Sequence, residues 1–257
     1  EPLVILTVTS SDNQVIRRVT GPASSGIHRV SWDLKFPSSR PLTDSASSSD
    51  SRGRSGPLAV PGEYKVTLSR YSRGEFTQMA GPVEFSTESL GTASLPADDR
   101  EALLEFQQKT ARLQRAVLGS VNAMEDAETR IKLIKKALMN TTRTGSLELY
   151  DQAREIELKL QEIRTSLLGD STVSSRNEPV LPGIRSRVQG IFSGQISSTS
   201  APTGTQREAY RIAAEEFGRT LENLNALIRE DLAELEGRLE EINAPWTPGR
   251  IPVWDPE

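Results

Sequence analysis

The chain has 257 residues, of which 35% are hydrophobic, 5% aromatic and 26% charged. This composition favours long solvated helices with a small core over the deep core of an α/β enzyme. Cysteine is absent and there is a single histidine, which excludes disulfides, thiolate nucleophiles, cysteine-ligated metals and multi-histidine metal sites. No apolar run approaches the roughly 18 residues of a membrane-spanning helix, so we expect no bilayer crossing.

The formal net charge of −4 is distributed without a concentrated basic face. Residues 1–91 carry ten basic and nine acidic side chains, and the remaining residues carry 21 basic and 26 acidic ones. Proteins that bind a nucleic-acid backbone present clustered lysine and arginine. We therefore expect no nucleic-acid partner.

Residues 1–91 show the alternation of apolar and polar side chains that is typical of short β-strands. In the run 26–34, His28 and Trp32 fall on the same face, which predicts that both are buried. Tyr64 begins a similar apolar face in the run 63–70. The patterns predict a small antiparallel β-sandwich with Trp32 and Tyr64 in its core. The predicted strands are 3–10, 15–20, 26–34, 63–70, 76–79 and 83–86, with a hairpin turn at Asp12-Asn13.

Residues 37–57 (PSSRPLTDSASSSDSRGRSGP) interrupt the strands with a segment dominated by serine, arginine and glycine. This segment has almost nothing to bury, so we predict a mobile loop that projects from the sandwich. Asp44 and Asp50 could ligate calcium, but their spacing matches no EF-hand loop. A solvated loop without a metal is the simpler interpretation.

After Pro96 the hydrophobic period changes to 3.6 residues, which is typical of amphipathic helices. Three long apolar seams follow, and helices of this kind are stable only when they pack together. The sequence predicts an elongated antiparallel three-helix bundle over residues 96–244, with a short extra helix at 182–194. The seams are Phe106, Thr110, Leu113, Val117, Ser120, Met124, Ala127, Ile131, Ile134 and Leu138; Leu149, Ala153, Ile156, Leu160, Ile163 and Leu167; and Tyr210, Ala213, Phe217, Leu221, Leu224, Ile228, Leu235, Leu239 and Ile242.

Residues 245–257 (PWTPGRIPVWDPE) contain four prolines and cannot continue a helix. We expect an extended tail whose Trp246 and Trp254 need apolar surroundings. Two alternatives stay open: the tryptophans pack on the helices of the same chain, or they dock onto a neighbouring domain. Aromatic anchors on a preordered backbone suit an interface because little conformational entropy is lost on docking.

Few residues offer chemistry. His28 has no neighbouring nucleophile and orienting group, so a structural role is the simpler explanation. The acid pairs Asp98-Asp99 and Glu215-Glu216 suit a helix start and a solvated helix face better than the paired acids of a glycosidase. We predict no catalytic, cofactor-binding or metal-binding residues. The candidates for packing and interaction are Trp32, Tyr64, Trp246 and Trp254.

Several strings of the sequence resemble the C-terminal region of large bacterial sortilin-type, or glycosyl-hydrolase-like, β-propeller repeat proteins. VTGPASSGIHRVSWDL and PLAVPGEYKVTL are similar to the immunoglobulin-like (Ig-like) module that follows the propeller, and also to the Ig-like repeat of flagellar-hook capping proteins. SRNEPVLPGIRSRVQGIFSGQISSTSAPTGTQREAYRIAAEEF and NAPWTPGRIPVW look like the helical module of that family. The resemblance implies an Ig-like sandwich over residues 1–91 and brings no active site, because the propeller lies outside these residues. The insertion at 37–57 is longer than the usual turn of the family.

The resemblance implies a C-terminal piece of a larger protein that a Gram-negative bacterium exports to the periplasm, cell surface or medium. A first residue Glu1 agrees with a mature product or a piece of a longer chain. We expect a non-catalytic accessory region that mediates domain packing and protein–protein association, without a cofactor. The expected partner is the upstream β-propeller of the same polypeptide or another protein.

Two alternative functions stay open. The first is a carbohydrate-binding module, which would need two of the aromatics Tyr71, Phe76 and Phe85 to be exposed in one plane. The second is a carboxylate-dependent hydrolase with a site between the modules. That function would need two facing acids, one with a raised pKa.

Overall fold

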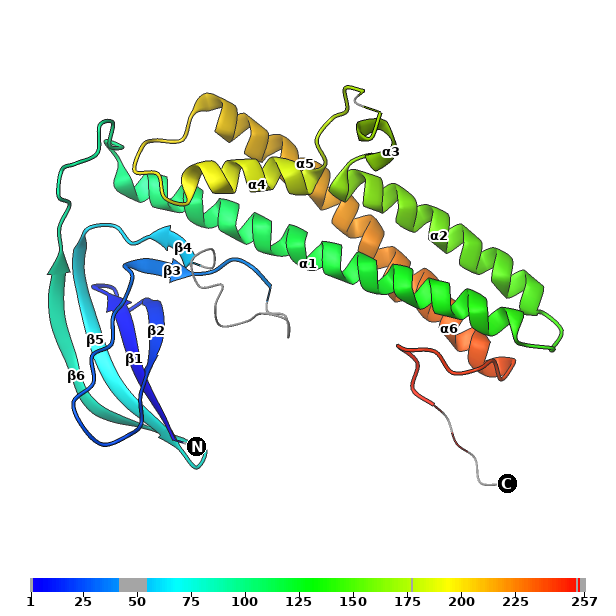
Figure 1. Cartoon of the computed structure of the whole chain (residues 1–257), viewed down its shortest axis with the longest axis horizontal. Helices are drawn as coiled ribbons and strands as arrows, with labels where there is room; N and C mark the ends of the chain where they lie inside the picture. Colours follow the sequence, from blue (N-terminus) through cyan, green and yellow to red (C-terminus); the bar gives the residue numbers. More distant parts are fainter. Residues whose placement is uncertain (1, 42–54, 177, 253, 255–257) are drawn as a thin grey trace. The chain divides into compact units, whose positions relative to one another are not determined.

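A computed structural model describes residues 2–41, 55–176, 178–252 and 254 of the chain. The protein is of the mixed α+β class, with an antiparallel four-stranded sheet and a helical region (Figure 1). Its contacts divide it into two compact units, Glu1–Arg112 with Ile191–Gly204 and Leu113–Gly190 with Thr205–Glu257. The division falls inside helices, after Arg112, Gly190 and Gly204, and not between residues 91 and 96, where the hydrophobic period changes.

The strands of the first unit are β1 (Leu3–Ser10), β2 (Val15–Gly21), β3 (Lys35–Pro37), β4 (Ser55–Leu58), β5 (Gly62–Ser72) and β6 (Glu75–Thr87). The larger sheet has the order β2-β1-β5-β6, and the smaller one pairs β3 with β4 (Figure 1). The β1–β2 hairpin turns at Asp12 and Asn13 as predicted, with Asn13 at a φ of 60°. The β5–β6 hairpin turns at Arg73 and Gly74, whose φ angles of 55° and 87° suit a tight hairpin turn.

The predicted strand at 26–34 is wrong. These residues form no strand, and His28 is exposed, with its Nε2 2.9 Å from the carbonyl oxygen of Ser24. Val30 and Trp32 are the half-buried members of the run, whereas His28 and Leu34 of the same predicted face are exposed. Strands need partners for their backbone hydrogen bonds, and the sequence pattern does not show whether a partner is available.

The segment 37–57 is more ordered at its ends than the predicted mobile loop. Pro37 lies in β3, Gly56 and Pro57 lie in β4, and the two strands pair in an antiparallel ribbon. Ser39 is also buried, at 1% exposure. The middle of the predicted loop, with Asp44 and Asp50, lies outside the described residues.

Two predicted short strands, 76–79 and 83–86, are one strand, β6. Its register against β5 shifts near Leu68, where Ala80 is the partner residue. This irregularity brings the positive-φ Gly81 and Pro82 inside the strand. Glycine and proline therefore mark a bulge here and not the end of a strand.

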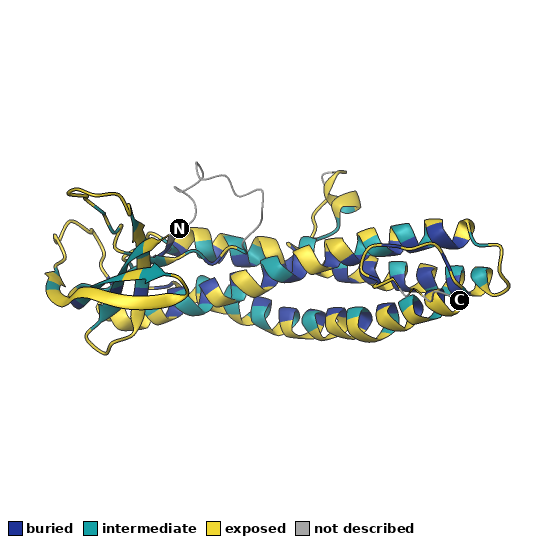
Figure 2. Cartoon of the chain, turned by 90° about the horizontal axis from the view of Figure 1, so that it is seen from below, coloured by how far each residue is buried: buried dark blue, intermediate teal, exposed yellow. Residues whose placement is uncertain are grey.

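The core of the sheet is small. Val8, Ile16 and Tyr64 are buried together, and Trp32, Phe36, Ala59, Val66 and Phe85 pack around them. Most residues of β1 and β5 are only half-buried, and those of β6 are almost all exposed, so exposed and intermediate residues dominate the sheet (Figure 2). The sheet thus leaves much of its surface uncovered within the described structure.

The helical elements are α1 (Arg100–Met139), α2 (Ser146–Leu168), α3 (Ser171–Ser174), α4 (Ile184–Gln195), α5 (Gly204–Ala226), the π-helical segment η2 (Leu227–Asp231) and α6 (Leu232–Glu241). The predicted short helix at 182–194 corresponds to α4. The sequence analysis did not anticipate α3, where the Asp170 carboxylate accepts hydrogen bonds from the backbone N–H groups of Thr172 and Val173.

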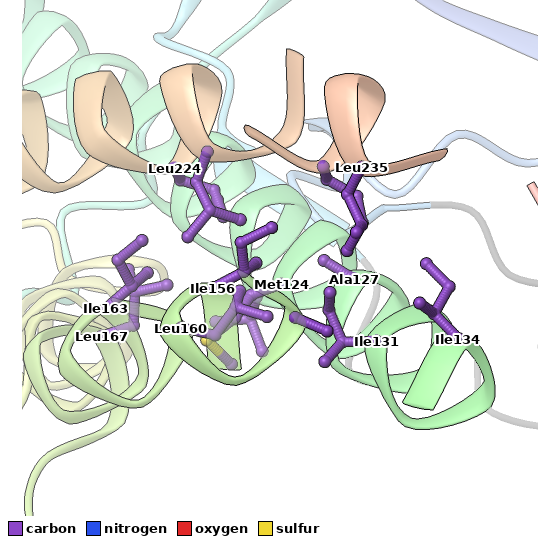
Figure 3. Packing of buried hydrophobic residues seen from close by; sticks show 14 of the residues in the cluster. Met124, Ala127, Ile131, Ile134, Ile156, Leu160, Ile163, Leu167, Leu224 and Leu235 are labelled. Atoms are coloured by element: carbon purple, nitrogen blue, oxygen red, sulfur yellow. The ribbon is translucent and has the colours of Figure 1, made fainter. Parts of the chain in front are cut away.

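The second unit has a continuous apolar core between its helices (Figure 3). All six predicted seam residues of α2 are buried, from Leu149 to Leu167. Met124 and Ile134 of α1 are fully buried opposite them, and Leu224 and Leu235 complete the core from the last helices (Figure 3). The 3.6-residue period correctly predicted which faces meet.

The last predicted seam misses two of the best buried residues, Leu227 at 2% and Leu232 at 0% exposure. They are five residues apart, the spacing of one π-helical hydrogen bond, and η2 begins at Leu227 and ends just before Leu232. A search at α-helical spacing skips such a pair. The π segment keeps α6 facing the core after the apolar pattern has slipped by one residue.

Candidate functional site

Trp32 and Tyr64 lie together in the small core of the sheet. Their ring centroids are 5.5 Å apart in an edge-to-face arrangement, and Phe85 contacts both rings. The Trp32 Nε1–H donates to the carbonyl of Lys35 at 3.0 Å, and the Tyr64 hydroxyl donates to the carbonyl of Val60. Burial raises the pKa of the Tyr64 hydroxyl above its ordinary value, so this group stays neutral and structural.

The C-terminal segment is held mainly by a buried arginine, whereas the side chains of its two tryptophans are mostly exposed. Trp246 is 57% exposed and Trp254 is 85% exposed, whereas Arg250 is 7% exposed. The Arg250 guanidinium pairs with the Glu240 carboxylate at 2.6 Å and donates to the carbonyls of Ala244 and Pro245. Trp246 contributes through its Nε1–H, which donates to the Arg250 carbonyl at 2.8 Å.

The sequence analysis missed Arg250 because arginine in a proline-rich segment is ordinarily solvated. The one available signal was the acid-rich end of the preceding helix, where Glu240 and Glu241 could pair with a cation. Trp254 makes its apolar surface available to a partner, as one of the two open alternatives requires.

A cavity of about 180 Å³ lies within the first unit. Its apolar wall includes Leu34, Leu58, Val60, Pro96, Leu103 and Leu104. Its polar lining includes Glu88, Arg100 and Gln107, together with the hydroxyl-bearing residues Thr87, Ser89, Ser198 and Thr199. A concave apolar space with a few polar groups is the usual form of a binding site for a small molecule.

Hydrogen bonds fix the helical side of this cavity. The Gln107 side-chain amide donates to the carbonyls of Gln195 and Ser198, at 2.7 and 3.0 Å. The Ala97 N–H donates to the Thr199 carbonyl at 2.7 Å. These contacts join the start of α1 to the end of α4 and the segment that follows it, so the cavity wall is built from parts of the sequence that are about 100 residues apart.

The carboxylates with resolved pKa shifts are all shifted downwards. Hydrogen bonds from Lys135 and Arg154 lower the pKa of Glu157, one from Arg211 lowers that of Glu208, and one from Arg250 lowers that of Glu240. These are the directions expected of ion pairs. A catalytic acid would instead need a raised pKa. Among the described residues, no group of three or more histidines and acids is placed to hold a metal ion.

One face of the large sheet presents two neighbouring aromatic rings. Tyr71 and Phe76 are paired across β5 and β6, and their ring centroids are 4.6 Å apart. Phe76 is 68% exposed, and Leu3 of β1 is paired with Tyr71 on the same face. Phe85 does not belong to this surface, because it packs against Trp32 in the core.

Comparisons with known proteins give no further guidance. No protein-family model matches the chain, and neither the curated proteins nor the solved structures contain a significant match. Within the described part of the chain, every helix is too short or too polar to span a lipid bilayer.

Proposed function

We propose that this chain is a non-catalytic accessory region that mediates domain packing and protein–protein association. The exposed apolar surface of β6 carries the proposal. Phe76, Met79 and Val83 are 68%, 57% and 59% exposed along one strand at the edge of the large sheet. Phe76 is paired with Tyr71 and Val83 with Val66, so this edge strand exposes apolar side chains on both of its faces. An exposed apolar edge strand is a surface on which a partner can pack.

The proposed architecture is an Ig-like β-sandwich followed by an antiparallel three-helix bundle. Phe36 lies in β3 and Ala59 directly follows β4, and both pack with Val8 and Tyr64 of the large sheet, which supports two facing layers. In the bundle, α1, α2 and the α5–α6 segment share one apolar core. The resemblance of the sequence to propeller-associated modules supports export from a Gram-negative cell and a β-propeller as the partner.

Hydrogen exchange tests this proposal. The exchange of the β6 amides is compared between the 257-residue chain and the intact gene product that contains it. We expect slower exchange in the intact protein, because a packed partner covers the strand. A variant with Phe76, Met79 and Val83 changed to serine should lose this protection but keep its melting temperature. Equal exchange in the two proteins would overturn the proposal.

A second candidate function is carbohydrate binding, which the Tyr71–Phe76 pair favours. Two adjacent rings on one open sheet face can stack against the apolar faces of sugar rings. Affinity electrophoresis in gels that contain polysaccharides tests this function. We expect Tyr71→Ala and Phe76→Ala to abolish retardation, and Met79→Ala, also exposed on β6, to leave it unchanged. Retention of the retardation in both aromatic variants contradicts this function.

A further inference from the structure

We propose that the cavity of the first unit binds a free apolar α-amino acid of about the size of leucine or phenylalanine. This site is separate from the association surface on β6. Four features support this assignment: the size of the cavity, its apolar wall, two opposite charges in its lining, and a bulky lining residue in a rare backbone conformation.

The cavity is large enough for only one apolar side chain of a ligand. Its volume is about 180 Å³. Pockets that enclose drug-sized molecules usually measure roughly 300–1,000 Å³, whereas an apolar cavity of about 150 Å³ holds benzene. The wall of Leu34, Leu58, Leu103 and Leu104 provides apolar contacts on several sides. The space therefore fits one branched aliphatic or aromatic group.

The charged residues of the lining indicate which polar groups the ligand carries. Glu88 and Arg100 are both exposed and line the same cavity, but neither forms an ion pair with any described residue. A guanidinium binds a carboxylate through charge-assisted hydrogen bonds, and a carboxylate binds an ammonium in the same way. A free amino acid carries both groups next to its side chain. A residue within a peptide carries neither, so the charge pattern favours the free amino acid.

Leu34 indicates that the apolar wall is preformed. Its φ of 58° is uncommon for a bulky residue, and its carbonyl accepts a hydrogen bond of 2.8 Å from the N–H of Ala59, another lining residue. Such conformations persist only where the surrounding structure enforces them, and they are frequent at ligand sites. Leu34 is 44% exposed and gains contact area when the cavity is filled.

Calorimetric titration of the 257-residue chain with L-leucine and L-phenylalanine tests the proposal. We expect saturable binding, at least about tenfold weaker for N-acetyl-leucine and for leucinamide, because each lacks one charge. Glu88→Gln and Arg100→Gln should each weaken leucine binding by at least about tenfold. The matched controls Glu101→Gln and Arg112→Gln, exposed on α1 outside the cavity, should leave the affinity unchanged.

The contrary outcomes are distinct. Absence of binding at concentrations up to about 10 mM overturns the proposal. Equal affinity for N-acetyl-leucinamide shows a merely apolar cavity, and equal affinity for the peptide Gly-Leu-Gly shows a site for a peptide side chain. Both results exclude a free amino acid as the selected ligand. Both cavity variants replace exposed side chains, so an unchanged melting temperature separates lost binding from misfolding.

Discussion

Gly249 lies directly against the guanidinium of Arg130. A Cβ atom at position 249 would come within 2.6 Å of Arg130 Nε, and the φ of Gly249 is 99°. Arg130 is itself held by Glu236 through hydrogen bonds of 2.6–3.0 Å and is only partly exposed. The C-terminal segment thus closes over an ion pair of the helical core at a position that only glycine accommodates.

We therefore expect Gly249→Ala to lower the free energy of unfolding by about 1–3 kcal/mol, because the new side chain meets both backbone strain and a fixed guanidinium. Urea unfolding followed by circular dichroism measures the change. The control is Gly218→Ala within α5, where an added Cβ meets no atom within 4 Å. This control should raise stability by about 0.5–1 kcal/mol, as alanine does in a helix. Similar results for the two variants would refute the close contact at Gly249.

The anchoring role of Arg250 predicts a contrast with Trp254. Arg250→Ala should cost about 2 kcal/mol, because it removes a buried guanidinium and leaves the carbonyls of Ala244 and Pro245 without their donors. Trp254→Ala should change the melting temperature little, since that side chain is 85% exposed. Truncation after Ala244 should lower the stability by about as much as Arg250→Ala does. A large loss of stability with Trp254→Ala and none with Arg250→Ala would show that Trp254, and not Arg250, anchors the C-terminal segment.

The Glu240–Arg250 pair predicts a pH dependence. The hydrogen bond from Arg250 lowers the pKa of Glu240 below its ordinary value of 4.5. The ion pair therefore contributes fully to the free energy of unfolding above pH 4.5, and this contribution is lost as the pH falls through the lowered pKa. Glu240 is 38% exposed, so solvent screening limits the contribution to less than about 1 kcal/mol. We expect the stability gap between wild type and Glu240→Gln to shrink at acid pH. The same comparison in an Arg250→Met background should show no such change, and a pH-independent gap would contradict the pair.

The sequence predicts an element well where the deciding pattern is local, and poorly where the element depends on a partner far along the chain. The α2 seam was predicted completely because Leu149 to Leu167 follow an uninterrupted helical period, which is local information. The sheet was predicted less well. Strand β3 pairs with β4, about twenty residues further along the chain, and alternation alone cannot reveal such a pairing. His28 illustrates the consequence, since it shares an alternating pattern with Trp32 but stays exposed.

The cavity was not predicted because its lining has no local signature. Leu34, Glu88 and Arg100 belong to three separate stretches, and Gln107 reaches the carbonyls of Gln195 and Ser198. No spacing rule relates these positions, and each residue type is ordinary in its own segment. The aromatic core was predicted more easily, because Trp32 and Tyr64 are rare, large side chains that a small sheet must bury.

The π segment η2 predicts that deletion of one of its residues is tolerated. Leu227 and Leu232 both face the core although five residues separate the two positions, as one π turn requires. Deletion of the exposed Arg229 would leave them four residues apart, so a regular α-helix could keep both leucines in the core.

We expect the chain without Arg229 to retain its helical circular dichroism and to melt cooperatively within about 8 °C of the wild type. Deletion of the exposed Glu222 in the regular part of α5 is the matched control. It rotates every later residue by about 100° and turns Leu235 and Leu239 away from the core, so a large loss of stability is expected. An equal loss of stability in the two deletion variants would contradict this prediction. It would show that α6 needs the π geometry for its packing, and that the segment does not simply accommodate one extra residue.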